Sequence, residues 1–431
     1  MEKNPKDNSG EQDEGPFIRH SKKRKISLPK IKAFAVFKNP VFRIYYGAIF
    51  AQRAAMNMQM ITRSLLIYRL TGSAALLGAT ALAHSLPSLL TALFGGALAD
   101  RVQKKYLLLI GQVASTLVFM GIAISLTTGY LNSDSWWILM CATAISGVFQ
   151  GITMPSRQSI IPEIVGDQSI MNAIALNNLS MSLMRFVAPA LAGFLIDAWD
   201  FHVVYYLMAT MSIISVILIA LLPLTGKAVT SSTKMLKSII EGFQYIWRNR
   251  IIVLLLAVML LAVLLSRPLQ QLMPIFTEDI FKVSALKMGI LLSIGGVGAT
   301  IGSLILASLP NKKRGLILLS AYLISGVTIV VFSFSTSYYL AIALMILIGM
   351  AQAIRMTLSN SLLMQNTEDK YRGRVMSIHE MEFAITSLGT FGAALLAEVV
   401  GVQWAIGGFA IALIFVAALS TVFVPRIRKL D

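Results

Sequence analysis

Three ionisable side chains stand close together in an otherwise apolar stretch near the end of the chain. His379, Glu380 and Glu382 fall within two helical turns of each other. A partly buried carboxyl group exchanges its proton nearer to neutral pH than an exposed one, and histidine already titrates there. The group is therefore our candidate for proton coupling. The alternative is a cytoplasmic gate in which these acids pair with Arg372, Arg374 or Arg185.

Other polar side chains also lie inside long apolar segments. A charge within a membrane span is costly and marks a functional site by default. The first such segment carries a broad polar face at helical spacing, and a polar face in a membrane helix must meet water or protein. The polar residues that we single out are Arg53, Asn57, Gln59, Gln150, Arg267, Gln271 and Arg355.

The composition says which kind of element must position these residues. Apolar residues make up 56% of the 431 residues and charged residues 13%, about half the charged share of soluble domains. The net charge of +17 lies in the tails and short loops, so we expect no nucleic-acid partner. The single Cys141 excludes a disulfide framework and a thiol-rich metal site, and we expect no metal and no cofactor. The sequence predicts an all-α membrane protein.

Apolar runs long enough to cross a bilayer recur along the chain after a polar tail. We predict twelve spans, at about 44–66, 75–98, 106–128, 136–156, 170–195, 203–224, 251–276, 287–309, 316–334, 338–360, 375–399 and 403–424. We expect the acidic residues at the ends of the spans to be solvated: Asp197, Glu278, Asp279 and Glu398.

Lysine and arginine gather on one set of alternate connections, together with the N-terminal tail. Such residues accumulate on cytoplasmic loops, so both termini are predicted to be cytoplasmic in a plasma (inner) membrane protein. We expect residues 1–40 to be a disordered basic tail, 41–224 a six-helix bundle, 225–250 a cytoplasmic linker, 251–424 a second six-helix bundle and 425–431 a tail.

The two predicted bundles share a weak internal similarity. Leu77-Gly78 opens the second span as Met288-Gly289 opens the eighth. Duplication within a helical membrane protein is typical of transporters with a substrate site near the midplane, between the repeats. This indicates a carrier rather than a channel.

The stretch from Gly96 to Lys105 resembles a family signature. It reads Gly-Ala-Leu-Ala-Asp-Arg-Val-Gln-Lys-Lys and is similar to the motif between spans 2 and 3 of the major facilitator superfamily, with Gln103 in place of the usual glycine. Thr71-Gly72-Ser73, Leu272-Met273-Pro274 and Arg372-Gly373-Arg374 resemble the enterobactin and macrolide exporters of that superfamily. The resemblance implies a gating role for Gly96, Asp100, Arg101, Lys104 and Lys105.

The resemblance also implies a central cavity lined by spans 1, 4, 7 and 10. Arg53, Arg267 and Arg355 would then make the cavity electropositive, which suits an anionic or zwitterionic amphiphile. The alternative is that these arginines snorkel or pair within the protein.

Two departures from the family pattern concern the mechanism. The antiporter motif of span 5 appears as Ala188-Pro189-Ala190-Leu191-Ala192-Gly193, preceded by Arg185. Pro189 and the small residues still allow a bent helix and close packing. In span 4 the arginine that serves proton coupling in drug antiporters is replaced by Gly147, three residues before Gln150.

Catalytic motifs are absent from the sequence, which contains no G-x-S-x-G, H-E-x-x-H or nucleotide-binding P-loop. We therefore expect a transporter and not an enzyme. The prediction is a monomeric secondary transporter, an antiporter that couples protons to the efflux of a small, amphiphilic, drug- or siderophore-like molecule. The alternatives are a nutrient or lysolipid transporter, or a transporter-like membrane sensor.

Overall fold

The computed structural model describes residues 36–166, 169–223, 235–310, 312–428 and 430. The tail predicted to be disordered, up to residue 35, lies outside the described residues. The first half contains α1 (Pro40–Thr71), α2 (Ala74–Arg101), α3 (Lys104–Thr127), α4 (Trp137–Ser159), α5 (Ile161–Val165), α6 (Ile170–Trp199) and α7 (Phe201–Ala220). Its six long helices correspond to the first six predicted spans.

The second half repeats this arrangement with one broken helix. Its seventh span is divided into α9 (Arg250–Ser266), α10 (Pro268–Gln271), α11 (Met273–Ile275) and the π-helical η3 (Phe276–Ile280). The remaining elements are α12 (Ala285–Ser308), α13 (Arg314–Phe334), α14 (Tyr338–Gln365), α15 (Asp369–Val400), α16 (Val402–Phe423) and α17 (Pro425–Arg428). Proline has no N–H and disrupts the helical hydrogen bonds, which accounts for the breaks before Pro268 and near Pro274.

Apolar composition agrees with a membrane location for this bundle. Among the described residues, ten helices are long and apolar enough to cross a membrane. The helix α1 is not among them, because Arg53, Asn57 and Gln59 interrupt its apolar run, and in α15 the stretch Ile385–Val400 is apolar.

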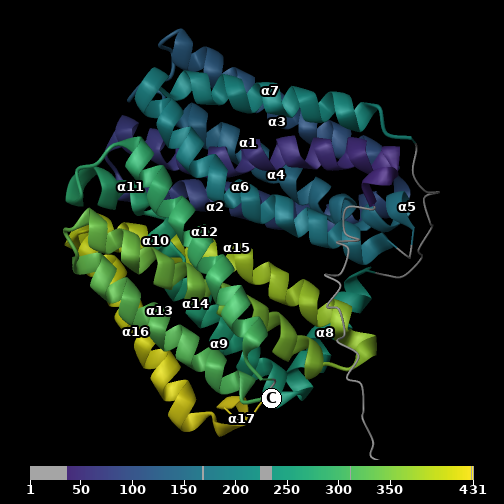
Figure 1. Ribbon diagram of the computed structural model, residues 1–431, viewed down its shortest axis with the longest axis vertical. Helices are drawn as coiled ribbons and strands as arrows, with labels where there is room; N and C mark the ends of the chain where they lie inside the picture. Colours follow the sequence, from purple (N-terminus) through teal and green to yellow (C-terminus); the bar gives the residue numbers. More distant parts are fainter. Residues whose placement is uncertain (1–35, 167–168, 224–234, 311, 429, 431) are drawn as a thin grey trace, which may run out of the picture.

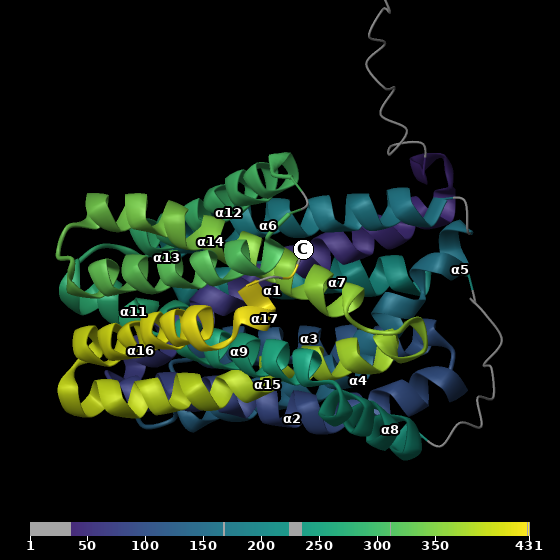
Figure 2. The same ribbon diagram turned by 90° about the horizontal axis from the view of Figure 1, so that it is seen from below.

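The two halves pack against each other along two pairs of helices, α6 with α12 and α2 with α15. Figure 1 shows the first half, in purple through blue to teal, above the second half, in teal-green through green to yellow. We call the end of the bundle that holds Asn39 and α17 the terminal end, and the end that holds the α1–α2 and α15–α16 connections the distal end. In Figures 1 and 2, α5 and α8 lie toward the terminal end and α11 toward the distal end.

Small residues let the two halves approach at both helix pairs. A Cβ atom on Gly289 of α12 would lie 2.3 Å from the carbonyl oxygen of Pro189 on α6. A Cβ atom on Gly193 of α6 would lie 2.2 Å from the carbonyl oxygen of Ala285. At the other pair, a Cβ on Gly78 would lie 2.5 Å from the Cβ of Ala394. The backbones are in contact, and we call these two lines of contact the seams.

The signature stretch between α2 and α3 is more helical than we predicted. The predicted spans end at about residue 98 and begin again at about residue 106, but α2 continues to Arg101 and α3 starts at Lys104. Only Val102 and Gln103 connect the two helices. Residues 96–101 of the signature stretch therefore belong to α2 itself.

The connection between the halves contains a helix that the sequence reading did not predict, α8 (Met235–Arg248). Its Tyr245 ring stacks on Tyr371 of α15, with centroids 4.1 Å apart and planes 12° from parallel. Its Glu241 carboxylate pairs with the guanidinium of Arg374 at 2.8 Å. Helix α8 is therefore anchored to the start of α15.

Candidate functional site

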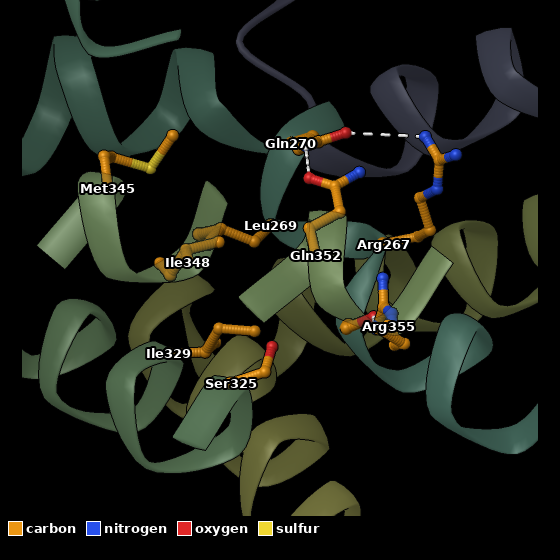
Figure 3. A pocket seen from close by; sticks show the side chains of 10 residues that line it. Arg267, Leu269, Gln270, Ser325, Ile329, Met345, Ile348, Gln352 and Arg355 are labelled. Carbon is orange, nitrogen blue, oxygen red and sulfur yellow. Dashed lines mark hydrogen bonds between the residues drawn. The ribbon is translucent and has the colours of Figure 1, made fainter. Parts of the chain in front are cut away.

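A recess in the second half brings several of the predicted polar residues together. It is lined by residues of the broken seventh span, α13 and α14, and is narrow in this state, with room for about one or two water molecules. Figure 3 shows a cationic side at Arg267 and Arg355 and an apolar side at Leu269, Ile348 and Met345. The lining of the recess thus has one charged and one apolar side.

Arg355 is held firmly although it lies deep in the helix bundle. Its side chain is only 7% exposed, and Nη1 donates a hydrogen bond of 2.6 Å to the Ser266 hydroxyl. The guanidinium carbon lies 5.7 Å from the centre of the Tyr322 ring, within the range of a cation–π contact. Fixed in this way, the guanidinium is a preorganised donor for an anionic group.

Amide side chains connect Arg267 to the opposite wall of the recess. Arg267 Nη1 lies 3.5 Å from Gln270 Oε1, and Gln270 donates to the side-chain oxygen of Gln352 at 3.2 Å. Arg267 sits at the break between α9 and α10, where the helix loses its regular hydrogen bonding. The predicted residue Gln271 points elsewhere: it donates to the Thr80 hydroxyl of α2 at 3.1 Å and so joins the two halves.

Four arginines form a continuous electrostatic series from one half to the other. Arg267 lies near enough to Arg355 and Arg185, and Arg53 near enough to Arg185, for their like charges to repel. We call Arg53, Arg185, Arg267 and Arg355 the arginine row. Like charges repel more strongly in a low-dielectric interior than in water, so an anion placed along the row would relieve the repulsion.

The predicted residues of the first half lie at the other end of this row. Arg53 donates to the Asn177 carbonyl and, at 3.2 Å, to the Ser180 hydroxyl of α6. Asn57 donates to the backbone oxygen of Arg53 at 2.8 Å, and Gln59 is partly buried on the same helix. Arg53 thus pairs within the protein, as the alternative interpretation held, while it remains part of the row.

Gln150 lies apart from the recess, next to His84 of α2, with which it shares a side-chain hydrogen bond. The structure gives a reason for Gly147 in the same helix. A Cβ atom there would lie 2.2 Å from the backbone oxygen of His84, so no arginine fits at this position. The cation that the family pattern places on span 4 is sterically excluded here.

The acidic candidates lie about three turns into α15. His379 Nδ1 is 3.3 Å from Glu382 Oε2, and Glu382 is 6% exposed and interacts electrostatically with Arg355. The side chain of Glu380 lies outside the described part of the chain. The proposed gate partners have other acids: Arg372 pairs with Asp369 at 2.6 Å, and Arg374 pairs with Glu241 of α8.

The lysines of the signature stretch make contacts within the first half. Lys104 pairs with Glu163 of α5, and Lys105 donates to the carbonyl oxygen of Ala220 at 2.7 Å, at the end of α7. A cation at the C-terminal end of a helix is favourably placed against the helix dipole. The side chains of Gly96, Asp100 and Arg101 lie outside the described part, so their gating role stays a prediction.

The distal end holds contacts that we did not predict. Arg69 pairs with Glu278 at 2.8 Å, and the Tyr68 hydroxyl donates to Asp279 at 2.5 Å, so α1 is bonded to η3. Asp197 and Glu398 accept backbone hydrogen bonds from the opposite half. Asp197, Asp279 and Glu398 are exposed, as expected, but the four acids also have partners distant in sequence, which we did not predict. In the sequence, the position of these acids at the ends of spans was the only sign of such contacts.

Comparison with known proteins agrees with this architecture. Residues 45–388 match the family model of the Major Facilitator Superfamily. Three relatives cover most of the chain at low identity: the multidrug efflux pump Tap of Mycolicibacterium fortuitum (22% identical, 91% of this chain and 98% of the relative), the staphyloferrin A transporter of Staphylococcus aureus (25%, 83% and 89%) and the enterobactin exporter EntS of Shigella boydii (23%, 78% and 80%).

Solved structures share the same fold. The nucleoside transporter NupG superposes with a TM-score of 0.71 at 14% identity, covering 89% of this chain and 99% of NupG. A bacterial homologue of the human lysosomal transporter Spinster, in an inward-facing and unoccupied conformation, gives a TM-score of 0.66 at 13% identity and covers 93% of this chain and 98% of the homologue. The chain is a multi-pass membrane transporter and belongs to the Major Facilitator Superfamily.

Proposed function

We propose that this transporter exports an anionic, amphiphilic small molecule by alternating access, with coupling to protons. The observation that carries the proposal is the arginine row, which runs from α1 and α6 to a recess with an apolar side. Charged side chains in membrane spans are costly unless they serve a substrate or ion pathway. The curated relatives named as a multidrug pump and an enterobactin exporter support export.

The sidedness follows from the basic residues at the terminal end. Lys104, Lys105 and Arg314 lie at connections on the same side as the starts of α1 and α8. By the positive-inside rule this side is cytoplasmic in a plasma (inner) membrane. Hydrogen bonds and ion pairs join the two halves toward the distal end, among them Arg69 with Glu278 and Ala285 with Asp197, which supports a closed distal end. The inward-facing Spinster homologue has a similar fold.

We assign proton binding to Glu382 and His379. As a carboxylate, Glu382 offsets part of the charge of Arg355. A proton on Glu382 would remove this competition and leave Arg355 available to an anionic substrate. Anion binding at the recess should therefore depend on pH, through the charge that Glu382 places beside Arg355.

The test is a substrate panel in energised inverted membrane vesicles. We expect accumulation of anionic amphiphiles over matched neutral and cationic analogues, and its abolition by a protonophore. Nigericin, which collapses only the pH gradient, should reduce accumulation if protons are coupled, whereas valinomycin with potassium tests the membrane potential. Preference for cations would refute the anion proposal, and binding without accumulation would indicate a sensor.

Two arginine variants connect this result to the site. Arg267→Gln should impair accumulation of the preferred anion, because it removes one cation of the arginine row. Arg248→Gln changes an exposed arginine of α8 and serves as the matched control. If Arg267→Gln and Arg248→Gln transport the anion equally well, Arg267 and the recess do not take part in transport.

A further inference from the structure

At the distal end, an acid of the first half caps a helix of the second. Asp197 lies near the end of α6, and its two carboxylate oxygens accept hydrogen bonds from the backbone N–H groups of Ala285 (3.0 Å) and Leu286 (2.8 Å). These are the first amides of α12, whose own N-cap residue Ser284 makes no side-chain capping bond. The start of α12 therefore takes its cap from across the interface.

In the same way, an acid of the second half caps a helix of the first. Glu398, near the end of α15, accepts the backbone N–H of Ala75 at 2.9 Å and lies 3.3 Å from the Ser73 hydroxyl. These groups begin α2. Carboxylates at a helix N-terminus satisfy amides that lack partners within the helix and interact favourably with the helix dipole.

The two caps occupy equivalent places in the internal repeat. Asp197 follows Gly193 of one seam by four residues, and Glu398 follows Ala394 of the other seam by four. On the receiving helices, Ala74 precedes Gly78 by one turn as Ala285 precedes Gly289. Each carboxylate thus lies one turn beyond the place where the backbones touch, on both sides of the pseudosymmetry axis.

We propose that Asp197 and Glu398 form a paired gate latch that holds the distal end closed. The proposal rests on the alternating access proposed above, because opening the distal end must separate α6 from α12 and α2 from α15. Separation returns four backbone and hydroxyl donors to water and removes both carboxylates from their helix dipoles. Both acids are exposed, so the latch contributes to the balance between two states of the carrier more than to its folding.

The experiment measures this balance directly, without a substrate. Spin labels at Tyr130→Cys in the α3–α4 connection and Tyr339→Cys in α14 report the distance between the halves at the distal end, in a Cys141→Ser background in lipid nanodiscs. Both positions are exposed, at 66% and 82%. Double electron–electron resonance then gives the populations of closed and open distal ends.

We expect Asp197→Ala and Glu398→Ala each to raise the ratio of open to closed about threefold to tenfold, as expected for loss of a helix cap. The double variant should show the product of the two effects, since well-separated sites act independently. Asp134→Ala removes an exposed distal acid of the α3–α4 connection and is the matched control.

Unchanged populations in the latch variants, or an equal change in Asp134→Ala, would overturn the latch. A further variant, Gly78→Trp, distinguishes this failure from a failure of alternating access, because its side chain cannot fit against Ala394 in the closed state. If Gly78→Trp separates the labels while the latch variants do not, the halves do move and only the latch is wrong. If no variant separates them, alternating access fails as well.

Discussion

The seams should make the carrier sensitive to a single methyl group. In Gly289→Ala, the new Cβ atom would lie 2.3 Å from the Pro189 oxygen and 2.9 Å from the Ala190 Cα, both backbone atoms that cannot rotate away. Overpacking of this kind costs about 1–3 kcal/mol, and here only the state with a closed distal end bears that cost. A free energy of this size corresponds to about a 5- to 150-fold change in the ratio of the two states. The population of the state with an open distal end should therefore increase.

The distance between spin labels at positions 130 and 339 measures this change. Gly392→Ala is the matched control, since it lies on the seam helix α15 but the structure places no described atom within 4 Å of its Cβ. Both substitutions gain the same helix propensity from alanine, about 1 kcal/mol, so a difference between them isolates the seam. If Gly289→Ala and Gly392→Ala give the same distance distribution, the close approach does not determine the conformational balance.

Three other substitutions test the recess and the α8 contact. Arg355→Gln should raise the KM for an anionic substrate about 10- to 150-fold in inverted vesicles, because it removes a charge-assisted hydrogen bond worth about 1.5–3 kcal/mol. Arg355→Lys should raise the KM less. An unchanged KM in Arg355→Gln would exclude contact between this arginine and the substrate. Glu382→Gln should lower that KM and flatten its dependence on pH, because the neutral amide no longer competes for Arg355; a pH profile like that of the parent would contradict the coupling role. Tyr245→Leu should lower the free energy of unfolding by about 1 kcal/mol in a thermal-shift measurement through loss of its ring stacking, whereas Trp247→Leu, at a 76% exposed position of the same helix, should change it little.

Hydropathy predicted the long helices well, because the thickness of a bilayer sets their length. The span predicted at about 170–195 is the helix Ile170–Trp199, and the span predicted at about 403–424 is Val402–Phe423. Hydropathy missed the breaks of the seventh span, since an apolar run looks the same whether its hydrogen bonds are regular or not. It also missed α8, whose ordering depends on a surface of α15 that the linker sequence does not reveal.

The site was predicted as residue types and not as contacts. Arg267 and Arg355 were singled out because buried charge is costly, and the recess brings them together. Glu398 was expected to be solvated, yet it accepts a hydrogen bond from Ala75, 323 residues away in the chain. Exposure alone could not distinguish a solvated acid from one that bridges two halves, because both stand at the end of a span.

The equivalence of the two distal caps has a consequence for how this interface can change. Two identical six-helix chains related by a twofold axis would present every contact twice, so one substitution would alter both copies together. Fusion into a single chain removes that constraint. Here one cap is an aspartate that accepts two amides and the other a glutamate that accepts an amide and a hydroxyl. The two sides of the gate can therefore be tuned separately, one residue at a time.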